Sequence, residues 1–152
     1  MTTVHRGGSS LAPPARGPAR QELQTVRARL PATPTAVQQA RQATREALAR
    51  WELTGLQETA ALIVSELVTN AIRHASADGG EVELRLEATE TWLWIQVHDA
   101  DPRPPQPRIP AALDEGGFGF VIVEALADKW GSCQSEGGKA VWAKLSIAGT
   151  LA

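Results

Sequence analysis

The chain has 152 residues, of which 43% are hydrophobic and 21% charged, and its formal net charge is -2. These values fit one globular domain with an ordinary core, and they give no reason to expect electrostatic attraction to nucleic acid or to a membrane surface. The single cysteine, Cys133, excludes an internal disulfide framework and a multi-cysteine zinc site, so we expect a cytoplasmic protein. No apolar run reaches the roughly 18 residues of a membrane span, and the N-terminus lacks the apolar stretch of a signal peptide.

The first part of the chain predicts a tail, a strand and a helix. Residues 1–20 are rich in glycine, serine and proline, so we expect a flexible tail ahead of a domain at 21–148. Alternating apolar residues predict a strand over about 22–30. Thr33 followed by Pro34 is typical of a helix start, and the apolar spacing predicts a helix over about 34–51. Its three arginines are most simply a solvated face, although an arginine can also reach a phosphate or an acidic partner; they are Arg41, Arg45 and Arg50.

A helix predicted over about 56–75 is the stretch around which the chain is organised. Its polar residues Glu66, Asn70 and His74 recur every four positions and therefore lie along one side, whereas the other sides are apolar. An asparagine oxygen facing a cavity suits Mg²⁺, and a glutamate one turn earlier can accept a proton from an attacking hydroxyl or water. Taken alone, the same stripe is also typical of a solvated helix face.

The middle of the chain predicts a β-hairpin followed by a lid. Apolar residues alternate with polar ones over about 81–87 and again over about 92–97, with a short turn between them. The second strand ends in Asp99. A proline-rich segment over 102–110 cannot pair in a sheet, and we interpret it as a surface lid.

The last part of the chain predicts a helix and a closing hairpin. Gly117 and Gly119 lie at the start of a helix expected over about 118–128, and glycines at a helix start let backbone amides approach an anion. The closing hairpin is expected over 129–136 and 140–147. In its final strand, one face is apolar and carries Val141, Ala143, Leu145 and Ile147.

Three tryptophans fall on the polar faces of these strands: Trp92, Trp94 and Trp142. If helices cover only one side of the sheet, the tryptophans lie on the other side and form an unusually apolar open surface. We expect this surface to contribute to a homodimer or to a protein partner site. The alternative is burial under the N-terminal strand and tail.

Together these motifs resemble the GHKL ATPase superfamily, and within it the stand-alone anti-sigma-factor serine/threonine kinases of bacteria. The segment 65–75 is similar to that family's N-box, Val97-His98-Asp99 to its first nucleotide box, and 117–120 with 123–128 to its second. The resemblance covers about residues 23–145. It implies an α/β two-layer sandwich of the Bergerat type, in which helices pack on one face of a mixed, mostly antiparallel sheet.

The resemblance also implies roles for single residues. Asn70 would ligate Mg²⁺, Glu66 would act as the general base, and Asp99 would accept a hydrogen bond from the adenine amino group of ATP. His74 would approach the triphosphate or serve as a hydrogen-bonding residue at the helix end. Positioning and charge neutralisation dominate phosphoryl transfer, so one metal ligand, one base and a ring of amides can suffice.

Gly117 and Gly119 would give backbone approach to the phosphates, under the lid between residues 101 and 116. Three positions depart from the family pattern. Asp101 replaces a usual glycine, Ala140 stands where relatives often carry a threonine, and Phe120 stands where leucine is common.

The activity implied is ATP-dependent phosphorylation of a serine or threonine in an anti-sigma-factor antagonist, with sequestration of a sigma factor as the companion activity. Two alternatives remain open. One is a non-catalytic nucleotide-sensing or protein-binding module of the same fold. The other is the ATP module of a histidine kinase, which would need a separate chain to present the phosphoacceptor histidine.

Overall fold

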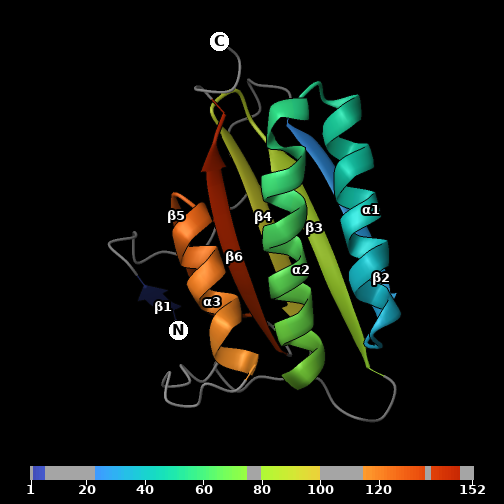
Figure 1. Ribbon diagram of the computed structural model, residues 1–152, viewed down its shortest axis with the longest axis vertical. Coiled ribbons are helices and arrows are strands. Elements are labelled where there is room, and N and C mark those ends of the chain that lie inside the picture. The colour runs from blue at the N-terminus through green and yellow to red at the C-terminus, as the bar shows by residue number, and fades with distance from the viewer. Residues whose placement is uncertain (1, 6–22, 75–79, 100–114, 136–137, 148–152) are drawn as a thin grey trace.

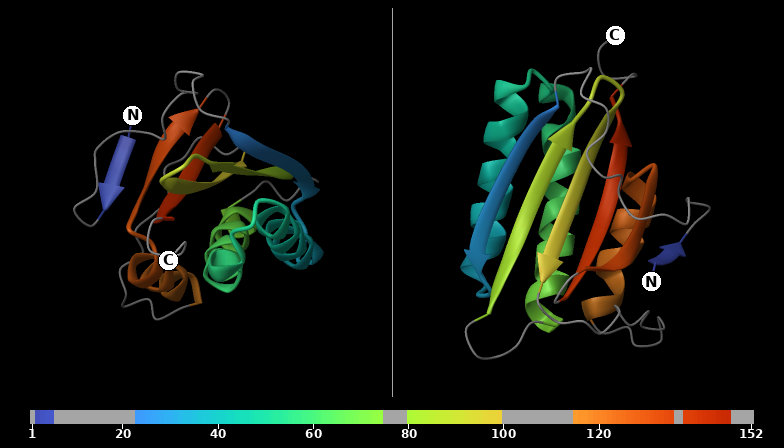
Figure 2. Two further views of the ribbon diagram at one scale, coloured as in Figure 1. Left: turned by 90° about the horizontal axis from the view of Figure 1, so that it is seen from above. Right: turned by 180° about the vertical axis from the view of Figure 1, so that it is seen from behind.

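The computed structural model describes residues 2–5, 23–74, 80–99, 115–135 and 138–147. Helices cover one face of a six-stranded sheet, which gives the two layers that the sequence predicts (Figures 1 and 2). The strand order is β1-β5-β6-β4-β3-β2, and all five pairings are antiparallel, so the expected mixed component does not occur among the described strands. The strands are β1 (Thr2–His5), β2 (Gln24–Pro31), β3 (Glu81–Ala88), β4 (Trp92–Asp99), β5 (Lys129–Ser135) and β6 (Gly138–Ser146).

The helices lie close to their predicted positions. They are α1 (Thr35–Arg50), α2 (Gln57–His74) and α3 (Glu115–Leu126), with a 3₁₀ turn at Thr54–Leu56. Helix α3 begins three residues earlier than the predicted start at 118. Pro34 is the N-cap residue of α1, where the sequence predicts Thr33 as the cap, and no side-chain hydrogen bond caps that end. None of the described helices is both long and apolar enough to cross a membrane.

The end of α1 places Glu52 in the left-handed region, with φ of 60°. The Leu53 N–H donates to the Leu48 carbonyl at 2.8 Å, and the Glu52 N–H donates to the Ala49 carbonyl at 3.1 Å. These two bonds form a Schellman motif, which commonly uses glycine at the position that Glu52 occupies. The chain therefore turns from α1 toward α2 before Gly55 is reached.

The core lies between the helices and the side of the sheet that faces them. On β3 alternate residues are buried, as the period of two along a strand requires, and β4 follows the same pattern except that Gln96 on the other face is also buried. The strand residues of this core include Val82, Leu84, Leu86, Leu93, Ile95 and Val97. The α2 residues include Ala60, Ile63, Val64, Leu67, Val68 and Ala71.

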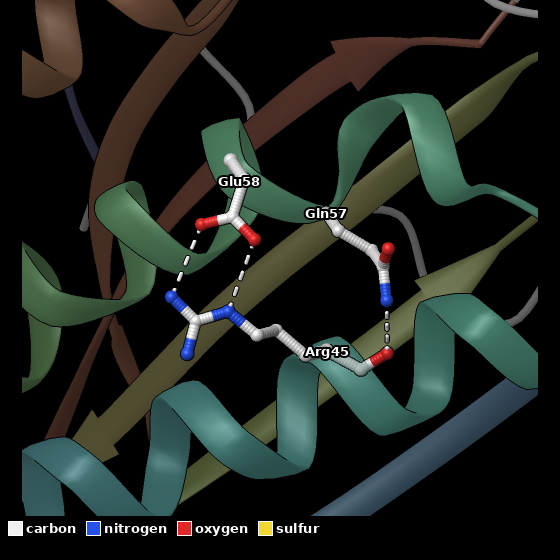
Figure 3. Close-up of polar contacts among 3 residues, drawn as sticks. All are labelled: Arg45, Gln57 and Glu58. Atoms are coloured by element: carbon white, nitrogen blue, oxygen red, sulfur yellow. Dashed lines mark hydrogen bonds and ion pairs between the residues drawn. The ribbon is translucent and has the colours of Figure 1, made fainter.

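Helices α1 and α2 are joined by a bidentate ion pair (Figure 3). The Arg45 guanidinium donates to both carboxylate oxygens of Glu58, at 3.1 and 3.2 Å, and Gln57 donates to the Arg45 carbonyl at 2.8 Å. The hydrogen bond to Glu58 raises the pKa of Arg45, and the same bond lowers the pKa of Glu58. Of the three roles considered for this arginine, the structure thus shows the acidic partner, and that partner lies within the chain.

Strand β1 occupies residues that the sequence analysis assigned to the tail. Residues Thr2–His5 pair with β5, with Thr2 opposite Cys133 and His5 opposite Trp130. β-branched residues at three of these positions favour an extended backbone. Residues 6–22 lie outside the described ranges, so the division into a tail and a domain at 21–148 stays a prediction.

The face of the sheet that turns away from the helices carries the three tryptophans. The ring centroids of Trp94 and Trp142 lie 5.5 Å apart, and Lys144 Nζ lies 4.0 Å from the ring centroid of Trp92. Trp142 is only 1% exposed, whereas Trp92 and Trp94 are half-buried. The expectation that Trp142 lies on an open surface is therefore wrong. The expected apolar surface is limited to Trp92 and Trp94.

His98 lies on the same outer face and shares a 3.0 Å hydrogen bond with Gln96. Burial, and to a lesser degree the charge of Arg85, lowers the pKa of His98 from 6.5 to about 4. A histidine with a depressed folded-state pKa stabilises the fold above its unfolded pKa, and this stabilisation is lost as the pH falls through the folded value. We expect a loss on the order of 2–4 kcal/mol between pH 6.5 and 4.

An NMR titration of the imidazole measures this pKa directly, and thermal unfolding from pH 7 to 4 measures the loss of stability. His98→Gln is the control, because it removes the titrating group and should flatten part of the pH dependence. A titration midpoint near 6.5 would contradict the prediction.

Candidate functional site

Four chain segments meet at one end of the two-layer sandwich (Figure 1). They are the C-terminal end of α2, the end of β4, the start of β6 and the start of α3. Helix α2 packs against α3, β4 and β6. Every residue that the sequence assigns to the site lies on one of these elements.

Glu66 and Asn70 lie one turn apart on α2, and both side chains are half-buried. The residues that flank them in sequence face the core, as shown by the burial of Leu67 and Ala71. Burial raises the pKa of the Glu66 carboxyl, because desolvation disfavours the charged form. A carboxylate with a raised pKa is a better proton acceptor near neutral pH than an ordinary surface glutamate. His74 is the last residue of α2, and its side chain lies outside what the structure describes.

Asp99 ends β4 on the side of the sheet that faces the helices. The alternation along β4 buries Asp99 together with Val97, Ile95 and Leu93. In the register between β4 and β6, Asp99 lies directly opposite Lys139. The two side chains form an ion pair in which Lys139 Nζ is 3.3 Å from one carboxylate oxygen and 3.5 Å from the other. Each side chain is only 2% exposed.

Lys139 is the residue of this site that sequence reasoning missed. Its signal was the alternation of β6, because the apolar positions 141, 143 and 145 extend back by two residues to 139. Ala140, which the sequence analysis compared with a threonine of the relatives, lies opposite His98 and so on the outer face. The β6 residue that faces the site beside Asp99 is therefore Lys139.

The glycines lie inside the first turns of α3 rather than ahead of it. The first four N–H groups of a helix have no intrahelical partner. Because α3 begins at Glu115, Gly117 belongs to this group and Gly119 lies one residue beyond it. The predicted lid between 101 and 116 lies outside the described ranges up to residue 114, and so does Asp101. Its last two residues, 115 and 116, are the first two residues of α3.

The structure thus brings the C-terminal half of α2, with Glu66 and Asn70, together with the end of β4, with Asp99, and the start of α3. It adds Lys139 to them. A carboxamide, a half-buried carboxylate, a buried ion pair and free helix amides together can contact a cation, an anionic group and a polar ring edge. Such groups can contact the phosphates and the base of a nucleotide.

Comparisons with known proteins bear on both fold and family. A comparison with curated proteins finds no match. Among solved structures, the crystal structure of the RsbU and RsbW domains of Rv1364c from Mycobacterium tuberculosis is similar, with a TM-score of 0.62 and 20% sequence identity. The match covers 80% of this chain and 32% of that chain, so this chain spans about a third of that length and the likeness shows the fold. The profile of the histidine kinase-like ATPase domain matches residues 30–145. This chain therefore belongs to the histidine kinase-like ATPase domain family.

Proposed function

We propose that this chain binds ATP with Mg²⁺ and phosphorylates a serine or threonine of an anti-sigma-factor antagonist, and that it also sequesters a sigma factor. The observation that carries the proposal is the half-buried Glu66, with its raised pKa, one helical turn before the half-buried Asn70. Membership of an ATPase-domain family and the fold shared with an RsbW domain support it.

The residues divide the chemistry between binding and proton transfer. Asp99 accepts a hydrogen bond from the adenine amino group, and the N–H of Gly117 approaches the phosphates. Glu66 takes the proton from the attacking serine or threonine hydroxyl. The hydroxyl oxygen forms a bond to the γ-phosphorus while the bond from that phosphorus to the β,γ-bridging oxygen breaks, which releases ADP.

Asn70 fits a role as the magnesium ligand. Mg²⁺ is usually held by one or two protein oxygens, with phosphate oxygens and waters at the other positions. A half-buried carboxamide supplies such an oxygen without adding negative charge beside the triphosphate. The metal, when bound, neutralises charge on the phosphate oxygens.

Calorimetry of ATP binding with and without Mg²⁺ tests the nucleotide site. We expect saturable binding that Mg²⁺ strengthens, and we expect Asn70→Ala to weaken the Mg²⁺-dependent affinity by at least about tenfold. Thr69→Ala is the matched control, since Thr69 is an exposed neighbour on the same helix. Equal ATP affinity of Asn70→Ala and the wild type, at all Mg²⁺ concentrations, would remove Asn70 from the site.

A second candidate function is a non-catalytic nucleotide-sensing or protein-binding module. Two sequence departures favour it: Asp101 replaces a usual glycine, and Ala140 stands where relatives often carry a threonine. Incubation with labelled ATP and a purified antagonist, followed by mapping of the modified residue, separates the candidates. Phosphoserine or phosphothreonine supports the kinase, phosphohistidine supports a histidine kinase module, and no transfer despite ATP binding supports the second candidate.

The proposal includes a homodimer formed through the outer face of the sheet. Trp92 and Trp94 stay half-exposed there, and aromatic residues are enriched in protein interfaces. Sedimentation analysis of the wild type and of Trp92→Ser measures the oligomeric state. A wild-type monomer at all concentrations would contradict this part of the proposal.

A further inference from the structure

We propose that Lys139 is a nucleobase-binding residue, whose ammonium donates a hydrogen bond to the N1 ring nitrogen of adenine while Asp99 accepts one from the N6 amino group. This inference rests on the proposed function, because it assigns a second contact within the same ATP site.

The first support is the position of the ion pair in the fold. Asp99 and Lys139 are directly opposed on β4 and β6 and lie on the side of the sheet that faces the helices. The end of β4 and the start of β6, which carry these two residues, lie at the end of the sheet nearest the start of α3 and the end of α2 (Figure 1). A ligand contacting Asp99 at this end is therefore also within reach of its cross-strand neighbour.

The second support is the hydrogen-bonding capacity of the pair. A lysine ammonium has three N–H donors, and the ammonium of Lys139 forms its ion pair with the carboxylate of Asp99. A carboxylate has about four lone-pair sites, so Asp99 can accept from lysine and from a ligand together. The pair presents a donor beside an acceptor in a site where each side chain is 2% exposed.

The third support is the chemistry of the base. Adenine presents an amino donor, N6, next to a ring-nitrogen acceptor, N1, on the same edge. This order complements an acceptor on Asp99 next to a donor on Lys139. In a site with little water, an unpaired ring nitrogen or an unpaired ammonium N–H is unfavourable, so the two groups favour a direct contact.

The test compares ATP with 1-deazaadenosine triphosphate, in which a C–H group replaces N1 and the amino group is kept. Calorimetry in the presence of Mg²⁺ gives the Kd of both nucleotides for the wild type, Lys139→Met and Lys139→Gln. Lys144→Met is the matched control, because Lys144 lies on the same strand but over the rings of Trp92 and Trp94 on the outer face.

We expect the wild type and Lys144→Met to bind ATP at least about tenfold more tightly than the deaza analogue, since a hydrogen bond to a charged donor is lost. Both Lys139 variants should reduce this ratio to within about twofold of unity. Both variants remove the charged ammonium donor. Lys139→Gln keeps an N–H donor as a partner for the buried Asp99 carboxylate, whereas Lys139→Met replaces the donor with an apolar side chain.

Three results would overturn the inference. One is that the wild type binds ATP and the deaza analogue with equal affinity, a result that can be obtained without any variant. Another is an unchanged ratio in a folded Lys139 variant. The third is tighter ATP binding by the Lys139 variants, which would mean that the ion pair blocks the base. In all three cases ATP still binds, so the proposed function survives. If folded wild type binds neither nucleotide, the proposed function fails and this inference fails with it.

Discussion

Replacing Glu66 by glutamine should lower the rate of phosphoryl transfer by about 10²- to 10⁴-fold while leaving ATP affinity nearly unchanged. The substitution keeps the size and polarity of the side chain but removes the group that takes the hydroxyl proton. Single-turnover transfer to the antagonist measures the rate, and calorimetry measures the affinity. Glu46→Gln serves as the control, since Glu46 is an exposed carboxylate on α1 that contacts only Gln42 among the described hydrogen bonds.

The pKa of Glu66 should make the rate of phosphoryl transfer depend on pH. Only the deprotonated carboxylate accepts a proton, so the rate should fall as the pH decreases through a pKa that burial has raised above the usual 4.5. A raised folded-state pKa means that the fold favours the protonated form. The associated stability is present below the unfolded pKa and is lost as the pH rises through the folded pKa.

Glutamine resembles the protonated glutamate, so Glu66→Gln should have a Tm at pH 7 that equals or exceeds that of the wild type. Lost transfer together with a Tm above or equal to the wild-type value would assign the defect to chemistry. Full transfer activity in this variant would exclude Glu66 as the base.

Removing the charge of Lys139 should have the largest effect on stability. Lys139→Met leaves the Asp99 carboxylate buried without its cation, and breaking a buried ion pair in this way costs about 3–5 kcal/mol of unfolding free energy. Urea denaturation followed by circular dichroism measures this loss. The double variant Asp99→Asn/Lys139→Met should recover most of it, because no uncompensated charge remains in the site.

Lys144→Met controls for the loss of a lysine from β6 at a position that is not fully buried. It should lose much less stability than Lys139→Met. If the double variant is as unstable as Lys139→Met, then the packing of the lysine chain, rather than its charge, stabilises this end of the sheet.

The positions of the regular elements could be predicted because their apolar periods are long and regular. The alternation on β3 and β4 and the period of α2 match the structure to within one or two residues. The turn after α1 could not be predicted in the same way. Glu52 adopts a conformation that favours glycine, and the hydrogen bonds to Leu48 and Ala49 that hold it there arise from the helix end itself.

The sequence predicted only those residues of the candidate site that lie within the family motifs. Glu66, Asn70 and Asp99 carry the resemblance to the family, and the structure places them on the expected elements. The alternation of β6 indicates that Lys139 shares a face with Val141, but its position opposite Asp99 depends on the register between β4 and β6. Register is a tertiary property, and a shift of one residue would have placed Ala140 opposite Asp99 instead.

The pairing of β1 with β5 has a consequence for the order of folding. Thr2 lies opposite Cys133, so nearly the whole described chain separates the two partners. By contrast, β3 and β4, like β5 and β6, are joined through short connections. Loop-closure entropy grows with chain separation, and contacts between distant residues form slowly. We therefore expect the sheet from β5 to β2 to assemble first, and the strand that comes first in sequence to join it last.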